Sequence, residues 1–400
     1  MNNLKRFLSV AVMLSILLCA FGAFAADTSF DTTKSVWADA ENGVTEIKMQ
    51  VKFVNETGEE GDNYLPKTVF EYSLSALDTD IPATDTAPTI HAGPEGGVAF
   101  TNDGNTTVWT KDYVKTTTDQ VSITLDPSKF PEPGVYRYYI TQADMTAAQN
   151  DLGIVPDAQA KKVFDVFVGM KDQEKIVTAT VLANMEEKAQ PVLDNDTNTA
   201  TYENKVIGYE NKIKTYKVTL TKTVTGDAGD MTYKFPFKVK LSSDVTEDDK
   251  TTIDGFPVVL ATADSTKATV GTTESTIGAV LSDIAIAHGG SVTIDSLPKS
   301  AVVSLMETIA AGEGYTITST VAGTDEGVKN ITGTSTHSES GDTYATEGEI
   351  KDADISLNYT NNRENISPTG VITRYLPFVL VLAGAVVLMA TSRKRSKAAA

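Results

Sequence analysis

Most of the chain consists of short runs in which apolar and polar residues alternate, with clusters of Gly, Asp, Asn and Pro between them. Examples of such runs are TYKVTLTKTV, KFPFKVKL, GVYRYYITQ, KKVFDVFV and ISLNYTNN. A side-chain period of two is typical of half-buried β-strands, and the clusters are typical of turns. Long amphipathic helical patterns do not occur in the sequence. We therefore predict an all-β fold of the sandwich type.

A faint internal repeat indicates two tandem domains. A lysine-bearing first strand, an aromatic strand, a Tyr/Leu strand ending in Gln or Glu, and a last strand ending in aromatic-x-Asn occur twice in this order. Such a repeat predicts two copies of one structural unit. We expect an N-terminal β-sandwich over residues 26–211 and a C-terminal one over residues 212–365.

The beginning of the chain is typical of a secretion signal. Residues 1–25 contain a basic start with Lys5, an apolar run, and Ala23-Phe24-Ala25 as a small-x-small cleavage site. We predict cleavage after Ala25 and therefore an extracellular protein. An uncleaved membrane anchor is the alternative.

The end of the chain combines a short motif, an apolar stretch and a basic terminus within residues 366–400. The motif contains Pro368-Thr369-Gly370, and the apolar stretch covers residues 376–390. About 15 to 20 apolar residues are marginal for a spanning helix, while a basic terminus stays on the cytoplasmic side. This order predicts a tail that presents the motif just outside the membrane. An ordinary tail anchor is the alternative.

The composition argues against several classes of partner and cofactor. With 53 acidic and 34 basic residues the formal charge is −19, so nucleic acid and anionic membranes would be repelled. The single cysteine, Cys19, lies in the predicted signal, so no disulfide is expected, although lipid attachment at Cys19 is an alternative. His91, His288 and His337 have no zinc-type spacing, and we expect no metal or other cofactor.

Three polar residues continue core-facing stripes in the C-terminal domain. Lys222, Glu307 and Asn361 each follow, two positions later, an apolar or aromatic residue of the same phase. Buried charges and amides are costly unless they find partners, so we expect the three side chains to meet. One interpretation is a buried ion pair beside a structural asparagine.

The other interpretation is a covalent bond that the domain makes by itself. Desolvation lowers the pKa of a lysine and raises that of a carboxyl group, and a neutral amine is a nucleophile. Glu307 would hydrogen-bond to the Asn361 carbonyl and transfer protons while Lys222 attacks and ammonia leaves. The product would be an isopeptide bond between the first and last strands of the domain.

Several patches resemble the backbone pilins of Gram-positive sortase-assembled pili, in particular the streptococcal two-domain type. These patches are VTLTKTVTG, VSLMET, ISLNYTN, ISPTGVIT, LPKTVFEYSL, PGVYRYYIT and GYENKI. The resemblance implies immunoglobulin-like, Cna-B-like domains in which Lys222, Glu307 and Asn361 act as nucleophile, proton shuttle and acceptor. It also implies a sortase that cleaves between Thr369 and Gly370 and holds Thr369 as a thioester.

The N-terminal domain departs from this pattern. Asn211 matches the acceptor, but Gln142 stands at the position of the glutamate and cannot gain or lose a proton. Lys52 is the first choice for its amine, with Lys34 and Lys48 as alternatives. We predict that this domain is uncrosslinked or crosslinks inefficiently.

The resemblance further implies that Thr369 is transferred to a lysine near the end of the first domain of an identical subunit. Lys205, six residues before Asn211, fits this place, and an ordinary solvated lysine is the alternative. The expected partners are a pilus-specific sortase, identical subunits, minor pilins and peptidoglycan, with only transient membrane contact through residues 376–390. A singly displayed adhesin or minor pilin is the alternative function. Neither reading makes the chain an enzyme with turnover.

Overall fold

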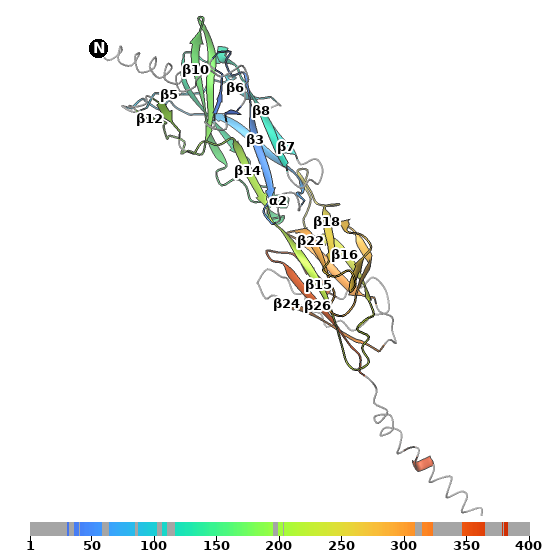
Figure 1. The fold of residues 1–400 in the computed structure, drawn as a ribbon. Helices are drawn as coiled ribbons and strands as arrows, with labels where there is room; N and C mark the ends of the chain where they lie inside the picture. The colour runs from blue at the N-terminus through green and yellow to red at the C-terminus, as the bar shows by residue number, and fades with distance from the viewer. Residues whose placement is uncertain are drawn as a thin grey trace, which may run out of the picture.

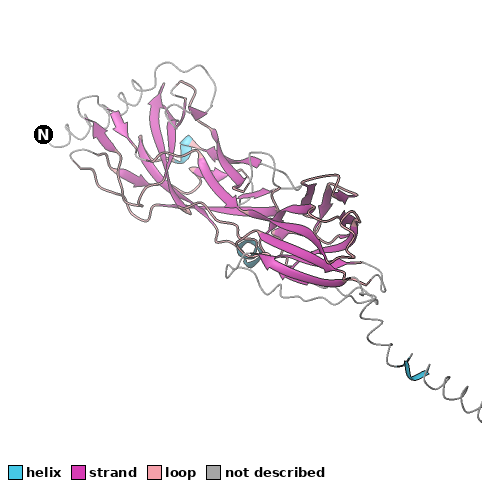
Figure 2. Ribbon diagram, turned by 60° about the horizontal axis from the view of Figure 1, so that its bottom comes forward, coloured by secondary structure: helices cyan, strands magenta, loops and turns pink. Residues whose placement is uncertain are grey.

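Strands provide nearly all of the secondary structure of this chain, which confirms the predicted all-β fold (Figure 2). The predicted signal and the Pro368-Thr369-Gly370 motif lie outside the described residues. Among those that are described, no helix is both long and apolar enough to cross a membrane. The computed structural model describes residues 30–31, 36–39, 41–57, 64–84, 87–101, 106–109, 117–194, 199–202, 204–308, 314–322, 346–364, 378 and 380–382.

Two β-rich domains lie end to end in an elongated molecule (Figure 1). The first domain ends with β14 (Gly208–Ile213), and the second begins with β15 (Thr215–Thr225). Only Lys214 separates these strands, so the chain crosses between the domains in a nearly continuous extended segment.

The first domain contains two main sheets, and a small hairpin pairs β12 (Val192–Asp194) with β13 (Thr199–Thr201). One main sheet has the order β14, β3 (Glu46–Asn55), β8 (Thr117–Leu125), β6 (Val98–Phe100). The other has the order β1 (Phe30–Asp31), β2 (Val36–Ala38), β11 (Glu174–Ala183), β10 (Lys161–Lys171), β9 (Gly134–Gln142), β4 (Lys67–Ala76), with β5 (Ile90–Ala92) beside β9 and β7 (Thr106–Trp109) beside β4. The two short helices are η1 (Pro127–Lys129) and α2 (Ala147–Asp151).

The second domain also has two sheets, and its first and last strands lie side by side and parallel. One sheet has the order β20 (Glu274–Thr276), β18 (Pro257–Thr262), β22 (Ser291–Pro298), β15, β26 (Ile355–Asn362), β24 (Thr316–Ala322). The other has the order β19 (Ala268–Val270), β21 (Val280–Ile286), β16 (Phe235–Ser243), β23 (Ala301–Glu307), β25 (Thr346–Glu349).

Alternating burial explains why these sequences form strands around a core. In β15 and β26 every second side chain is buried and the residues between them are more exposed. Successive side chains of a strand point to opposite faces, so one face packs in the core and the other faces solvent. Lys222 and Asn361 fall on the buried faces of these two strands.

The two domains also contact each other beyond the connecting segment. A short strand of the second domain, β17 (Thr251–Thr252), pairs antiparallel with β4 of the first. The hydroxyls of Thr68 and Thr251 lie 3.0 Å apart, and Lys250 Nζ lies 2.5 Å from Glu71 Oε2. The junction is therefore hydrogen-bonded on a second side as well.

Candidate crosslinking site

The structure brings Lys222, Glu307 and Asn361 together inside the second domain, from β15, β23 and β26 respectively. Lys222 Nζ lies 2.8 Å from Glu307 Oε2, and Asn361 Nδ2 donates a hydrogen bond of 2.5 Å to Glu307 Oε1. The three residues are only 1%, 5% and 0% exposed. One carboxyl group thus bridges the amine and the amide in a site closed to solvent.

Aromatic rings surround the amine. Lys222 Nζ lies 4.5 Å from the ring centroid of Phe235 and 5.8 Å from that of Phe237. The Phe237 ring in turn packs edge-on against Tyr359, with centroids 5.2 Å apart. Rings can attract a cation but replace little of the water that an ammonium group loses on burial.

This environment makes the neutral form of the Lys222 amine more common than it is for a lysine in water. Burial lowers the pKa of Lys222 from 10.5 to about 8, although the charge and hydrogen bond of Glu307 act in the opposite direction. Near neutral pH a minor fraction of a lysine with such a pKa is unprotonated, and this neutral amine is a nucleophile. Burial thus increases the fraction of Lys222 that carries a neutral amine within the folded domain.

The Asn361 amide has one buried oxygen that could take part in such a reaction. Asn361 Oδ1 is buried and has no hydrogen-bond partner within the described part of the chain. A half-turn of the amide would place this oxygen against the Glu307 carboxyl group, and a proton passed on from Lys222 through that group would polarise the carbonyl carbon. Attack by Lys222 would then form a C–N bond while the amide nitrogen leaves as ammonia, with Glu307 carrying protons between the two.

The lowered pKa leads to a pH prediction for Asn361→Ala, which keeps the amine but removes its acceptor. The folded-state pKa of Lys222, about 8, is below the reference value of 10.5, so between these pH values the unfolded chain binds more protons. The unfolding free energy should therefore rise with pH across this window, by about 3 kcal/mol in total.

Denaturant unfolding of Asn361→Ala at several pH values would measure this rise. The control is the double variant Asn361→Ala/Lys222→Met, in which no buried amine remains to titrate. The prediction fails if both variants show the same dependence on pH.

In the first domain the structure brings two of the three predicted residues together. Gln142, at the end of β9, donates a hydrogen bond of 2.7 Å from Nε2 to Asn211 Oδ1 on β14. Both residues are buried. Lys52 is not part of this site, because it lies on the exposed face of β3 and pairs with Glu210 at 3.2 Å. Lys48 is exposed on the same face.

Lys34 lies outside the described residues, so it stays a sequence-based alternative for the amine of the first domain. Lys205 is half-buried and forms an isolated bridge with Ala183, three residues before β14 begins. No cluster of His, Cys, Asp and Glu suited to a metal ion occurs in the described ranges.

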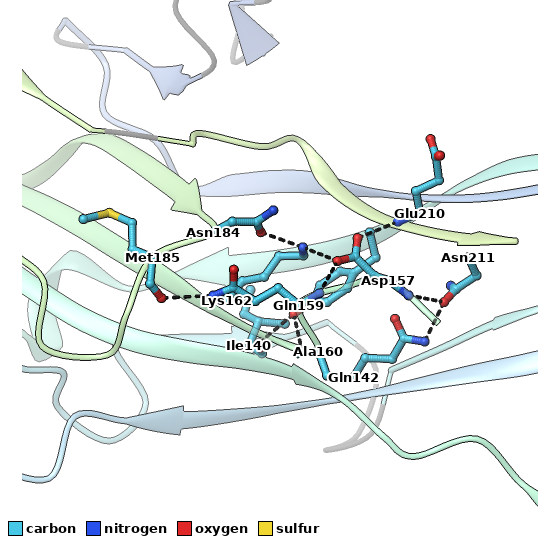
Figure 3. A network of polar contacts seen from close by, with 11 residues as sticks. Ile140, Gln142, Asp157, Gln159, Ala160, Lys162, Asn184, Met185, Glu210 and Asn211 are labelled. Atoms are coloured by element: carbon cyan, nitrogen blue, oxygen red, sulfur yellow. Dashed lines mark hydrogen bonds and ion pairs between the residues drawn. The ribbon is translucent and has the colours of Figure 1, made fainter. Parts of the chain in front are cut away.

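The structure adds a buried lysine that the sequence did not single out. Lys162, on β10, is fully buried, and its Nζ lies 2.8 Å from Asp157 Oδ1 and 2.7 Å from Asn184 Oδ1 (Figure 3). Burial lowers the pKa of Lys162, opposed by Asp157. Consecutive residues of β10 are buried, so an alternating pattern could not reveal which of its lysines faces the core.

Fold and site together define a tandem β-sandwich protein with a Lys–Glu–Asn triad in one core. Residues 216–363, which contain that triad, match the family described as Domain of unknown function (DUF7601). A curated relative named Pilin, from Streptococcus pyogenes serotype M1, is 24% identical over 257 residues. The match covers 62% of this chain and 64% of the relative, which is just under two thirds of the relative's length.

Solved structures of similar fold are major pilins of Streptococcus pyogenes. One crystal structure of the major pilin has a TM-score of 0.52 at 19% identity and covers 81% of this chain and 100% of that chain. The major pilin T3.2 from serotype GAS13637 has a TM-score of 0.51 at 20% identity and covers 80% and 99%. The structural likeness shows a shared fold, and with the curated relative it confirms the resemblance to a streptococcal shaft pilin.

Proposed function

We propose that this chain is a structural subunit of a covalently polymerised pilus on the cell surface, and that Lys222 and Asn361 form an isopeptide bond inside it. The observation that supports this best is the closed contact set of Lys222, Glu307 and Asn361 in the core of the second domain. The bond would join the first and last strands of that domain, which lie side by side. The reaction would occur once per chain, without turnover.

The proposal continues with a sortase that joins Thr369 of one subunit to Lys205 of the next. The position of Lys205 supports this assignment, because it lies in the first domain just before β14. The strand β26 runs parallel to β15, which starts at the junction, so β26 ends at the far end of the second domain. In the sequence the donor Thr369 follows β26 of the second domain, whereas the acceptor Lys205 lies in the first domain, and a donor and an acceptor in different domains favour head-to-tail growth.

The two ends of the sequence support an extracellular location. A secretion signal over residues 1–25 and a sorting signal over residues 366–400 would deliver the chain to a membrane sortase and then to the pilus or cell wall. The acidic surface expected from the charge of −19 suits a solvated filament. Minor pilins and peptidoglycan are further partners compatible with this role.

Surface extracts separated under denaturing conditions test the polymer. We expect a ladder of high-molecular-weight species that resists SDS, because each link would be covalent. Replacing Thr369 by alanine should leave only monomer. A singly displayed adhesin would give one band in both cases and would refute the proposed role.

Intact mass tests the internal bond separately. The purified chain should be lighter than its sequence by one ammonia, and Lys222→Ala should have the full sequence mass. A peptide that joins Lys222 to Asn361 should appear after proteolysis. An unmodified mass for the parent chain would contradict the crosslink.

A further inference from the structure

The core of the first domain repeats the framework of the crosslinking site. In each domain the last strand ends in aromatic-x-Asn and pairs in parallel with an early strand. Tyr359 is opposite Lys222 in the second domain, and in the first domain Tyr209 is opposite Val51. By strand register, Val51 therefore stands where the lysine would be.

The surroundings of the two tyrosines are also equivalent. The hydroxyl of Tyr209 donates to a backbone carbonyl on the strand that ends in Gln142, at 2.6 Å, and that of Tyr359 donates to the strand that ends in Glu307, at 3.2 Å. Each tyrosine ring packs against an aromatic ring from the other sheet of its domain, Tyr72 on β4 and Phe237 on β16, with centroids 4.8 and 5.2 Å apart. Gln142 thus occupies the place of the glutamate.

The remaining polar groups of this site are only partly satisfied. Gln142 Nε2 donates to Asn211 Oδ1, but Gln142 Oε1 is buried and has no hydrogen-bond partner among the described residues, and the buried Asn211 amide has only a weak contact with the Tyr72 hydroxyl besides. Buried polar atoms without partners are costly and uncommon in native proteins. Their presence fits an acceptor site that has kept its asparagine while two other positions changed.

A second polar group lies next to this site and is well satisfied (Figure 3). Lys162 Nζ contacts Asp157 Oδ1 at 2.8 Å and Asn184 Oδ1 at 2.7 Å. It also lies 4.5 Å from the ring centroid of Tyr209, the same distance that separates Lys222 Nζ from its nearest ring. This lysine reaches the core from β10 rather than from β3.

Asp157 connects this lysine to the last strand of the domain. Its Oδ2 accepts a hydrogen bond of 2.9 Å from the Glu210 backbone N–H, and its own N–H donates to Asn211 Oδ1 at 3.3 Å. Its Oδ1 also accepts from the Gln159 backbone N–H at 2.9 Å. Backbone donors therefore hold both carboxyl oxygens of Asp157 in place, which fixes its contact with Lys162 against the last strand of the domain.

We propose that Asp157 and Lys162 form a non-covalent clamp that holds β14 in the first domain, as the proposed isopeptide bond holds β26 in the second. The second half of the proposal is that the site around Asn211 forms a crosslink when Val51 is replaced by lysine and Gln142 by glutamate. The second half of this proposal rests on the proposed crosslink of the second domain. The clamp itself does not, because it depends only on the contacts within the first domain.

The double variant Val51→Lys/Gln142→Glu tests the site. We expect the full chain to lose a second ammonia and to yield a peptide joining position 51 to Asn211. The single variant Val51→Lys, which keeps Gln142 and so has no carboxyl group at position 142, should lose only one. A folded double variant that loses only one ammonia would overturn this part.

The Lys222–Asn361 peptide is measured in the same digest. Its absence would count against the function proposed above, whereas its presence without the new peptide would count against the inference alone. A crosslinked peptide joining Lys162 to Asn184 in the unmodified chain would overturn the clamp, since Lys162 would then form a covalent bond instead of an ion pair.

Lys162→Met tests the clamp in an otherwise unchanged chain. Because removing one partner of a buried pair leaves the other charge unsatisfied, the first domain should melt about 10 °C lower, with faster amide hydrogen exchange in β14. Lys52→Met is the matched control, because Lys52 pairs with Glu210 of the same strand at the exposed surface. Unchanged exchange in β14 of Lys162→Met would contradict the clamp.

Discussion

Replacing Glu307 by alanine is expected to prevent the internal bond while leaving both of its ends in place. The second domain should lose about 5 kcal/mol or more of unfolding free energy. The intact mass should be that of the unmodified sequence, because no carboxyl group remains between Lys222 and Asn361 to move protons.

Two physical effects contribute to this loss. A bond from Lys222 to Asn361 closes a loop over residues 222–361, and a crosslink across so long a loop restricts the unfolded chain by about 5 kcal/mol in the chain-entropy account. The variant also leaves the buried amine of Lys222 without its 2.8 Å partner, which costs further stability unless the amine loses its proton.

Two companion variants separate these effects. Asn361→Ala removes the bond but keeps the Lys222–Glu307 pair, so its loss should be the smaller one. Glu307→Gln keeps the size of the side chain and places in the second domain the residue type that Gln142 provides in the first. We expect no ammonia loss in Glu307→Gln, and a crosslinked product there would disprove the proton-shuttle role.

The sequence predicted that Lys222, Glu307 and Asn361 face the core of the second domain, because each lies in phase with apolar residues of its strand. Buried side chains alternate in β15 and β26, with Lys222 and Asn361 in phase with them, and in β23 the sequence itself places Glu307 in phase with Val303 and Leu305. The two-residue period of each strand is therefore enough to predict that these three side chains face the core, without knowledge of how the strands pair.

The first-domain site could not be predicted in the same way. Lys162 lies on β10, which is a central strand buried on both faces, so alternation carries no information about which lysine is inside. The position of Val51 follows from the pairing of β3 with β14, and the Lys52–Glu210 contact shows that these strands are joined across a separation of 158 residues. No local pattern encodes such a register.

The proposed links also explain how a non-covalent clamp could suffice in the first domain. If subunits join through Lys205 and Thr369, the shortest covalent path runs along β14 and β15 to Lys222, across the isopeptide bond to Asn361, and on to the tail. Most of the first domain lies outside this path. A pulling force along the filament would then act on β14 and on the crosslinked domain first.

Replacing Lys205 by alanine is therefore expected to have a large and specific effect. The SDS-resistant ladder should disappear and only monomer should remain, since Thr369 would have no amine to join. The variant should still fold and lose one ammonia, because Lys205 lies in the first domain, whereas Lys222, Glu307 and Asn361 meet in the core of the second.

Lys212→Ala is a suitable control for this experiment. Lys212 lies on β14, is partly exposed and pairs with Glu56 at 2.8 Å, so its loss removes an amine and a surface ion pair from the same region. Surface pairs of this kind contribute little stability, typically less than about 1 kcal/mol. Ladders should persist in Lys212→Ala and vanish in Lys205→Ala, and the reverse result would move the acceptor from Lys205 to Lys212.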